Sequence, residues 1–247
     1  MPTEKLNVKI TDSLSFQMIL IKGSEFIMGD KNSKHEDEKN EHRVVLDDFY
    51  LGQYPVTQEL WQAIMKENPS SFKGANRPVE TVSWGAVQRF LKQLNMATSR
   101  TFRLPTEAEW EYAGRGGVYS QGYAYSGSDK LKQVGWYNEN SRNETRDVGL
   151  SLANELGLYD MSGNVYEWCD DRFSVDYYLQ CLSNGVVRNP VNTEGDRCVV
   201  RGGSFFSVVD GCRIAFRNGF APDDIDGDVG FRLCLPMQLT GMLPDSQ

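Results

Sequence analysis

The sequence predicts an α+β protein with little regular secondary structure and a surface made largely of loops. The first half of the chain contains short strand patterns followed by helix patterns. The second half, from about residue 116, is rich in Gly, Asn, Ser and Tyr and has few periodic runs. Segregated elements of this kind are typical of the α+β class. With 247 residues, 40% of them hydrophobic, the chain can bury a sizeable core, and we expect residues 1–247 to form a single domain.

Short strands are predicted in the first fifty residues. Residues 16–21 and 25–29 are apolar runs on either side of a Lys22-Gly23 turn. A third run, residues 43–46, follows the polar loop 30–42. These patterns place the first sheet-forming elements before any helix.

Three helices are predicted from their N-terminal caps. Thr57 and Ser83 each precede a run in which apolar residues recur at helical spacing. The two apolar faces consist of Leu60, Trp61, Ile64 and Met65, and of Val87, Phe90, Leu91 and Leu94. Thr106 and Glu109 have the spacing of a capping box, which predicts a third, shorter helix.

Composition narrows the possible functions. The formal net charge is −8 and no basic stripe is present, so we predict no nucleic-acid partner. No apolar run approaches the roughly 18 residues that a membrane-spanning helix requires, and no signal peptide is visible at the start. The five cysteines include no CxxC pair, which disfavours zinc and a dense disulfide framework but leaves one disulfide open.

The most informative feature is a fixed frame around a compositionally restricted segment. Residues 201–204 read RGGS and residues 230–233 read GFRL. From Arg197 to Pro236 the chain contains no Lys, Glu, Gln, Met or Trp, although these five types account for 51 of its 247 residues. The absence of five residue types sets this segment apart from the rest of the chain and indicates that it has a distinct role.

Several segments together resemble the formylglycine-generating (sulfatase-modifying factor) domain family. They are FIMG at 26–29, YPVT at 54–57, RPVETVSW at 77–84, FRLPTEAEWEYA at 102–113, GLYDMSGNVYEW at 157–168, and the RGGS and GFRL frame. The resemblance covers about residues 16–236. It implies a variant of the C-type lectin fold, of the formylglycine-generating-enzyme type. Because one fold hosts unrelated functions, it does not by itself imply an activity.

The catalytic cysteine pair of that family is not intact in this chain. The resemblance implies two copper-binding cysteines, and the first of these positions is Ser207. The second is Cys212 if the alignment gap is placed favourably, and otherwise Cys212 is a small buried hydrophobe. Copper(I) prefers two soft thiolates, so we predict no enzymatic activity. The alternative is a copper oxidase acting on protein cysteine, or a catalytically degenerate relative.

Iron-dependent chemistry also lacks a ligand set. An imidazole iron site requires two or three histidines, and the chain has only His35 and His42. Both lie in the charged segment HEDEKNEH, which we interpret as a solvated loop.

The restricted segment resembles a second branch of this domain, the variable proteins of diversity-generating retroelements, of the treponemal type. In that branch, Asn codons of a template are mutagenised at adenines, and the resulting codons cannot encode the five missing residue types. The resemblance places a variable region at about 205–229, between RGGS and GFRL. We therefore predict a ligand-binding variable protein that displays a hypervariable patch on a lectin-type scaffold.

Aromatic anchors among adaptable polar groups are typical of recognition surfaces. The predicted ligand-binding residues are Phe205, Phe206, Ser207, Val208, Val209, Asp210, Phe216, Asn218, Phe220, Asp223, Asp224, Asp226 and Asp228. The competing interpretation is that the phenylalanines belong to the core and the aspartates keep a loop soluble. The partner is an unknown protein or surface ligand, with a basic one favoured. We expect a cell-surface or extracellular location, and leave open a lipid anchor or leader preceding Met1.

No cofactor is predicted, and a structural calcium ion is the one metal considered. The family resemblance places calcium near Asn164, Val165 and Glu167, where side-chain oxygens and a backbone carbonyl suit a hard cation. The alternative is that Asn164 forms a turn and Glu167 a buried ion pair with an arginine. An EF-hand match at residues 224–235 fails, because Val229 and Leu235 replace the required Gly and Glu.

Overall fold

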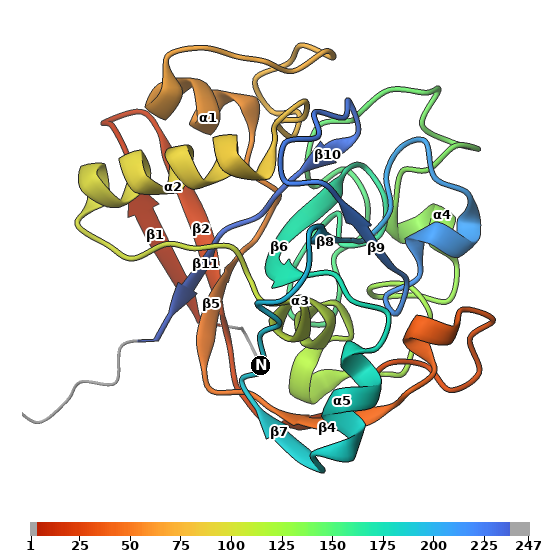
Figure 1. The fold of residues 1–247 in the computed structure, drawn as a ribbon. Helices are drawn as coiled ribbons and strands as arrows, with labels where there is room; N and C mark the ends of the chain where they lie inside the picture. The colour runs from red at the N-terminus through yellow and green to blue at the C-terminus, as the bar shows by residue number, and fades with distance from the viewer. Residues whose placement is uncertain (1–3, 238–247) are drawn as a thin grey trace, which may run out of the picture.

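The computed structural model describes residues 4–237, and within them the strands form three small sheets (Figure 1). The first sheet has the order β1 (Lys5–Lys9), β2 (Ser15–Ile21), β5 (Phe49–Gly52) and β11 (Cys234–Pro236). The second has the order β10 (Val229–Gly230), β6 (Tyr166–Arg172), β8 (Cys198–Arg201) and β9 (Arg217–Phe220). The third has the order β3 (Glu25–Met28), β4 (His42–Val45) and β7 (Val186–Arg188). Strands distant in sequence therefore pair, and β11 returns to the N-terminal sheet.

Short helices connect these sheets. The α-helices of the described residues are α1 (Gln58–Met65), α2 (Trp84–Thr98), α3 (Glu107–Gly114), α4 (Leu131–Val134) and α5 (Tyr177–Ser183). The 3₁₀ turns are η1 (Glu36–Glu38), η2 (Gly117–Tyr119) and η3 (Val209–Cys212). Within residues 4–237, none of the helices combines the length and the apolar character needed to cross a membrane.

The three predicted helix starts are confirmed by their caps. The side chains of Thr57 and Ser83 accept hydrogen bonds from backbone N–H groups three residues later. Thr106 and Glu109 make both reciprocal bonds of a capping box. Each cap satisfies donors that the first turn of a helix leaves unpaired, which is why these residues fix where the helices begin.

The predicted strands are also confirmed, as β2, β3 and β4. The strands on either side of Lys22-Gly23 do not pair with each other, because β2 joins the first sheet and β3 the third. The backbone of Gly23 passes so close to Leu46 that a Cβ there would lie 2.2 Å from the Leu46 carbonyl oxygen. Gly23 thus marks the place where the chain crosses from one sheet to the next.

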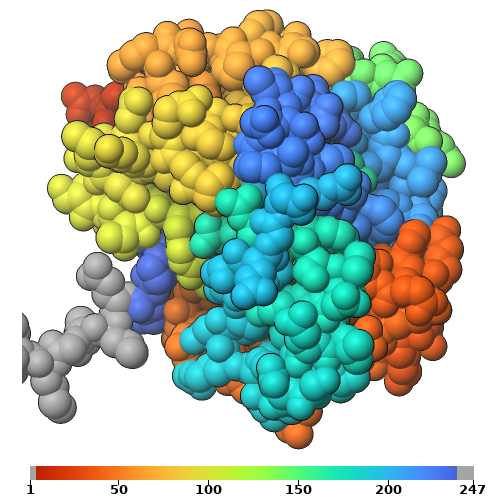
Figure 2. Space-filling view, viewed as in Figure 1, coloured from red at the N-terminus to blue at the C-terminus, as the bar shows by residue number. Residues whose placement is uncertain are grey.

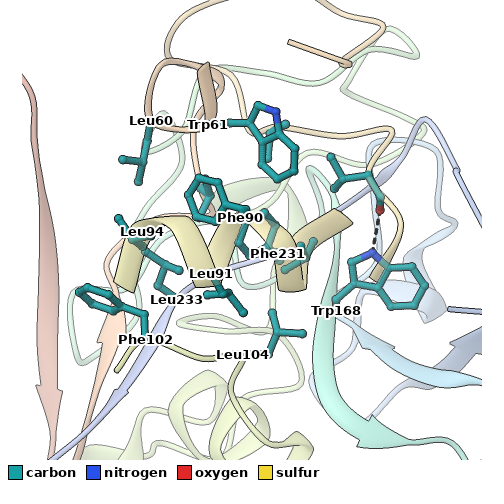
Figure 3. Packing of buried hydrophobic residues seen from close by; sticks show 14 of the residues in the cluster. Leu60, Trp61, Phe90, Leu91, Leu94, Phe102, Leu104, Trp168, Phe231 and Leu233 are labelled. Carbon is teal, nitrogen blue, oxygen red and sulfur yellow. Dashed lines mark hydrogen bonds between the residues drawn. The ribbon is translucent and has the colours of Figure 1, made fainter. Parts of the chain in front are cut away.

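Aromatic side chains from α1, α2 and the GFRL segment pack together in the core beside the first sheet (Figure 3). Trp61 and Phe90 stack in parallel with their ring centroids 5.1 Å apart, and Phe231 meets both edge-on. The indole of Trp168 donates a 2.9 Å hydrogen bond to the Val82 carbonyl oxygen. Phe231 is therefore a core anchor of the segment that closes the variable region.

Candidate ligand-binding site

The RGGS frame is anchored by an arginine buried beneath the surface. Arg201, at the end of β8, forms ion pairs of 2.5 Å with Glu107 and 2.7 Å with Glu111, both on α3. Burial alone would raise the pKa of Glu111, but Arg115 and Arg201 hold it at about 2. Arg217 on β9 shares Glu107 through bonds of 2.6 and 2.8 Å. The chain before and within the variable region is thus fixed to one helix.

The GFRL frame has an equivalent anchor. Arg232 is fully buried and donates two 2.6 Å hydrogen bonds to Glu167. Glu167 also accepts a 2.7 Å bond from the Trp110 indole. A charge taken out of water requires an opposite charge beside it, so both ends of the variable region depend on buried arginine–glutamate contacts.

Glycine is required at the bend that follows Arg201. Gly203 has φ +73°, a conformation that side chains with a Cβ rarely adopt. A Cβ at this position would lie 2.7 Å from the Cys212 sulfur. Steric contact at Gly203 therefore restricts the path of the backbone into the first variable loop.

Between the buried frame residues, most predicted ligand-binding residues reach solvent. Phe206, Val208 and Val209 are exposed, Phe206 to 66%, and so are the aspartates at 223, 224 and 226. Six positions are half-buried, namely Ser207, Asp210, Phe216, Asn218, Phe220 and Asp228. We call these twelve residues the variable surface. Ile225, 64% exposed at the tip of the second loop, was missed by the sequence interpretation although acids flank it.

The two loops of the variable surface lie side by side and are linked. The Ser204 hydroxyl donates a 2.6 Å hydrogen bond to Asp228, and the Tyr166 amide donates one of 2.8 Å to the Asp228 carbonyl oxygen. Figure 2 shows the blue surface of residues 221–228 next to the lighter blue surface of residues 206–216. A ligand could therefore contact both loops at once.

Tyr166 on β6 forms the floor between the loops, and the sequence interpretation did not select it. Its ring meets Phe220 edge-on at 6.0 Å. Burial raises the pKa of its phenol, while hydrogen bonds with Ser207 and Asn218 act in the opposite direction. Side chains from two separate variable segments thus converge on one fixed tyrosine.

The 30–41 loop borders the variable surface. His35 lies 2.8 Å from Asp210, Lys34 lies 3.2 Å from the same carboxylate, and the His35 ring meets Phe216 edge-on at 5.3 Å. Although partial burial opposes the shift, hydrogen bonds from His35 and Arg213 hold the pKa of Asp210 below its usual range. The negative charge of the Asp210 carboxylate is therefore already balanced by basic side chains of the same protein, Lys34 and Arg213.

The interpretation of both histidines as members of a solvated loop is wrong for His42. This residue is buried on β4, its Nδ1 lies 2.9 Å from the Asn40 carbonyl oxygen, and its ring meets Tyr178 edge-on. Burial lowers its pKa. The hydrophobic alternation of β4, in which residues 42 and 44 face inward, explains why a histidine at this position is buried.

Phe205 is placed beneath the variable surface. It is only 7% exposed, and its ring meets Phe72 edge-on at 5.3 Å. Its amide donates to the Asn164 carbonyl oxygen and its carbonyl accepts a 2.7 Å bond from the Ser141 hydroxyl. For this one position the geometry agrees with the competing interpretation of a core phenylalanine.

The residues considered for calcium do not fit a cation. Both oxygens of Glu167 accept bonds from Arg232, whose positive charge would repel a metal ion. Asn164 has φ +68°, and its side chain bonds the backbone of Arg146 through both its oxygen and its nitrogen. Val165 is buried beside them. Asn164 therefore forms a turn and Glu167 a buried ion pair with Arg232, as in the alternative to a calcium site. Among the described residues, no group of three or more His, Cys, Asp or Glu side chains could hold a metal ion.

The cysteines do not provide a copper site of the family type. All five are buried and unpaired, so no disulfide forms among them. Burial raises the pKa of the Cys212 thiol to about 12, which disfavours the thiolate that binds metal. At the partner position Ser207 offers a hydroxyl, which accepts a 2.9 Å bond from the Ser204 amide. In this structure Cys212 packs in the interior, and the Ser207 hydroxyl stabilises a turn.

Small sheets, loop-rich connections and a frame of buried arginines define a formylglycine-generating-enzyme-type fold, a variant of the C-type lectin fold. The model of the sulfatase-modifying factor enzyme 1-like domain matches residues 6–236, and the chain belongs to this family.

Relatives of several kinds share this domain. The chaperone protein LppX of Paenibacillus barcinonensis is 34% identical, over 90% of each chain. The formylglycine-generating enzyme of Streptomyces coelicolor is 36% identical over 67% of this chain, and the chain spans only 54% of that enzyme. The structure of Treponema denticola variable protein 1 is similar, with a TM-score of 0.86 and 28% identity over 94% of this chain and 99% of that one. These names show that the family includes both enzymes and proteins named for other roles.

Proposed function

We propose that this protein is a ligand-binding variable protein of a diversity-generating retroelement. The observation that supports it is the match between composition and exposure. Within the segment that lacks five residue types, frame residues such as Arg201, Arg217 and Arg232 are buried, while twelve of the thirteen predicted ligand-binding residues are exposed or half-buried. Substitution at such positions costs little folding free energy, so they can be diversified without loss of the scaffold.

The surface suits a protein or other surface ligand with basic groups. Phe206, Val208 and Ile225 offer apolar anchors on two adjacent loops. No ion pair of the described residues engages Asp223 or Asp226, so their charges are available to a partner. Asp210 contributes less, because Lys34 and Arg213 already pair with it. A cell-surface or extracellular location would bring this surface to its ligand.

The DNA around the gene tests the proposal. We expect a near-copy of the sequence encoding residues 197–236 that differs only at adenines, next to a reverse transcriptase gene. Its absence would refute diversification as the origin of the restricted composition.

A second test uses the protein itself. Joint replacement of Phe206, Val208 and Ile225 by asparagine should leave the melting temperature within a few degrees, because all three side chains project into solvent. The control is Ile214→Asn, which places an amide at a position 2% exposed in the core and should unfold the protein. Equal losses in both proteins would show that the loops are structural and would contradict the proposal.

The oxidase alternative finds no support in the site. Copper(I) chemistry would require two thiolates, and the chain provides one buried thiol of raised pKa and one serine. We therefore propose a binding role without catalysis.

A further inference from the structure

A second apolar surface lies on α5 and β7, outside the variable surface. Val175, Leu179, Leu182 and Val186 are between 46% and 58% exposed. Leu179 and Leu182 are three residues apart on α5, and Val186 begins the adjacent strand β7. We call these four residues the α5–β7 surface. Exposed aliphatic side chains scattered singly are ordinary, but four within residues 175–186, on α5, on β7 and just before α5, indicate an interaction surface.

The neighbouring edge of the third sheet is open. β7 is the last strand in the order β3-β4-β7, and no other strand of the described residues pairs with it. Apart from the ladder to β4, the amides of Val186 and Arg188 have no hydrogen-bond partner within residues 4–237. An unpaired edge of this kind is a template for another chain, although its three residues make it a short one.

Charge indicates which partner fits. The chain has a formal net charge of −8, yet between Ser174 and Val187 only Asp176 is charged. Arg188, which follows, is already paired with Asp47. Arg43, the β4 neighbour of Val186 in the ladder, is exposed but already paired with Glu25, so a strongly basic or acidic partner would find few unpaired charges beside this surface. In a contact with a second copy of the same surface, Asp176 is the one charge within residues 174–187 that would face a like charge.

We propose that a second copy of this chain binds the α5–β7 surface around a twofold axis. In such an isologous contact the same patch faces itself, so a neutral apolar patch is self-complementary. The four side chains expose on the order of 400 Å² per copy, about half of what each partner buries in an interface of standard size. The flanking backbone of β7 supplies further contact area and, through antiparallel pairing, a defined orientation.

The position of this surface has a consequence for ligand binding. In Figure 1, α5 and β7 lie at the end of the molecule opposite to β10 and the loop before it. Figure 2 likewise shows the surface of residues 177–188 well separated from that of residues 221–228. A dimer formed through α5 and β7 therefore leaves the 221–228 loop of each copy free. Two surfaces in one particle strengthen binding to a multivalent target without any new contact to the ligand.

Sedimentation equilibrium tests the dimer directly. From about 1 to about 200 µM the mass should rise from that of one chain towards that of two. Leu179→Asp combined with Val186→Asp should keep the protein monomeric over the whole range. The matched control is Leu150→Asp combined with Leu152→Asp. These two leucines lie on another segment and are more exposed than Leu179 and Val186, so the control should dimerise like the parent. A parent that stays monomeric throughout, or a control that dissociates as readily, would overturn the proposal.

Cross-linking gives an independent readout, because it also traps a dimer that is only partly populated at equilibrium. All five native cysteines are buried, so Val186→Cys would add one accessible thiol. Near the twofold axis, two such thiols should form an intermolecular disulfide under mild oxidation, at a rate well above that of Leu152→Cys. Equal rates for the two variants would place the contact elsewhere and reject the α5–β7 interface. Circular dichroism of each variant confirms that it is folded.

Discussion

The Ser204 hydroxyl lies 2.6 Å from the Asp228 carboxylate and donates a hydrogen bond to it. Ser204 is the last residue of the RGGS frame, and Asp228 is the last acidic residue before the GFRL frame. Burial raises the pKa of Asp228, and the bond from Ser204 counteracts this effect. This hydrogen bond links the beginning of the first loop of the variable surface to the end of the second.

Ser204→Ala should destabilise the protein by about 1–3 kcal/mol, because it leaves a partly buried carboxylate without its donor. Urea unfolding followed by tryptophan fluorescence measures the change. Ser183→Ala removes an exposed hydroxyl that bonds a helix carbonyl, and it should cost less than about 0.5 kcal/mol. Equal costs for the two serines would show that the Ser204–Asp228 bond adds nothing to stability.

Phe205 and Phe206 are adjacent in sequence but should respond in opposite ways. Phe205→Ala should cost about 3–5 kcal/mol of unfolding free energy, because the ring is buried against Phe72. Phe206→Ala should change stability by less than about 0.5 kcal/mol and should weaken ligand binding, since an exposed aromatic side chain is a typical anchor. Thermal melts of the two variants measure the first effect. A large loss of stability in Phe206→Ala would remove this residue from the variable surface.

Burial decides what the salt bridges contribute. Arg232→Met should cost about 3–5 kcal/mol, because it leaves the fully buried carboxylate of Glu167 without its cation. Arg43→Met breaks an exposed pair with Glu25 and should cost about 0–1 kcal/mol. Denaturant titration of both variants makes the comparison. A small loss in Arg232→Met would mean that the GFRL anchor is dispensable.

The sequence predicted the elements whose signals are local. Caps at Thr57, Ser83 and Thr106 mark helix starts because they satisfy donors within one turn. The pairing of β5 with β11 leaves no such signal, because it joins Leu51 to Cys234 across most of the chain. The same is true of β6 and β8, which are buried on both faces along most of their length and whose pairing is interrupted by a bulge.

The candidate site was predictable only in part for the same reason. The restricted composition identified the loops that reach solvent, because it is a property of contiguous residues. It could not separate Phe205 from Phe206, since burial of the former depends on Phe72, more than a hundred residues earlier. Neither could it select Tyr166 or His35, which reach the variable surface through the packing of separate elements.

Asp171 should give the stability a characteristic pH dependence. Its buried carboxylate accepts bonds from the amides of Glu107 and Asn192, and burial raises its pKa to about 7. A raised pKa means that the favourable contribution is complete below about pH 4 and is lost as pH rises towards 7. The difference in unfolding free energy between the parent and Asp171→Asn should therefore shrink by at least about 1 kcal/mol over this interval. A difference that is constant from pH 4 to 7 would contradict the raised pKa.

Cys212 should behave as a packing residue and not as a metal ligand. Its thiol is fully buried and its pKa is raised to about 12, so almost no thiolate exists near neutral pH. Iodoacetamide at about pH 8 should leave it unmodified in the folded protein and alkylate it in urea, as peptide mass spectrometry can show. Copper(I) titration against a competing chelator should give the same result for the parent and for Cys212→Ala. A tight copper site that disappears in Cys212→Ala would instead favour a copper oxidase. Copper(I) binds a cysteine as its thiolate, so such a site would show that Cys212 ionises despite its burial.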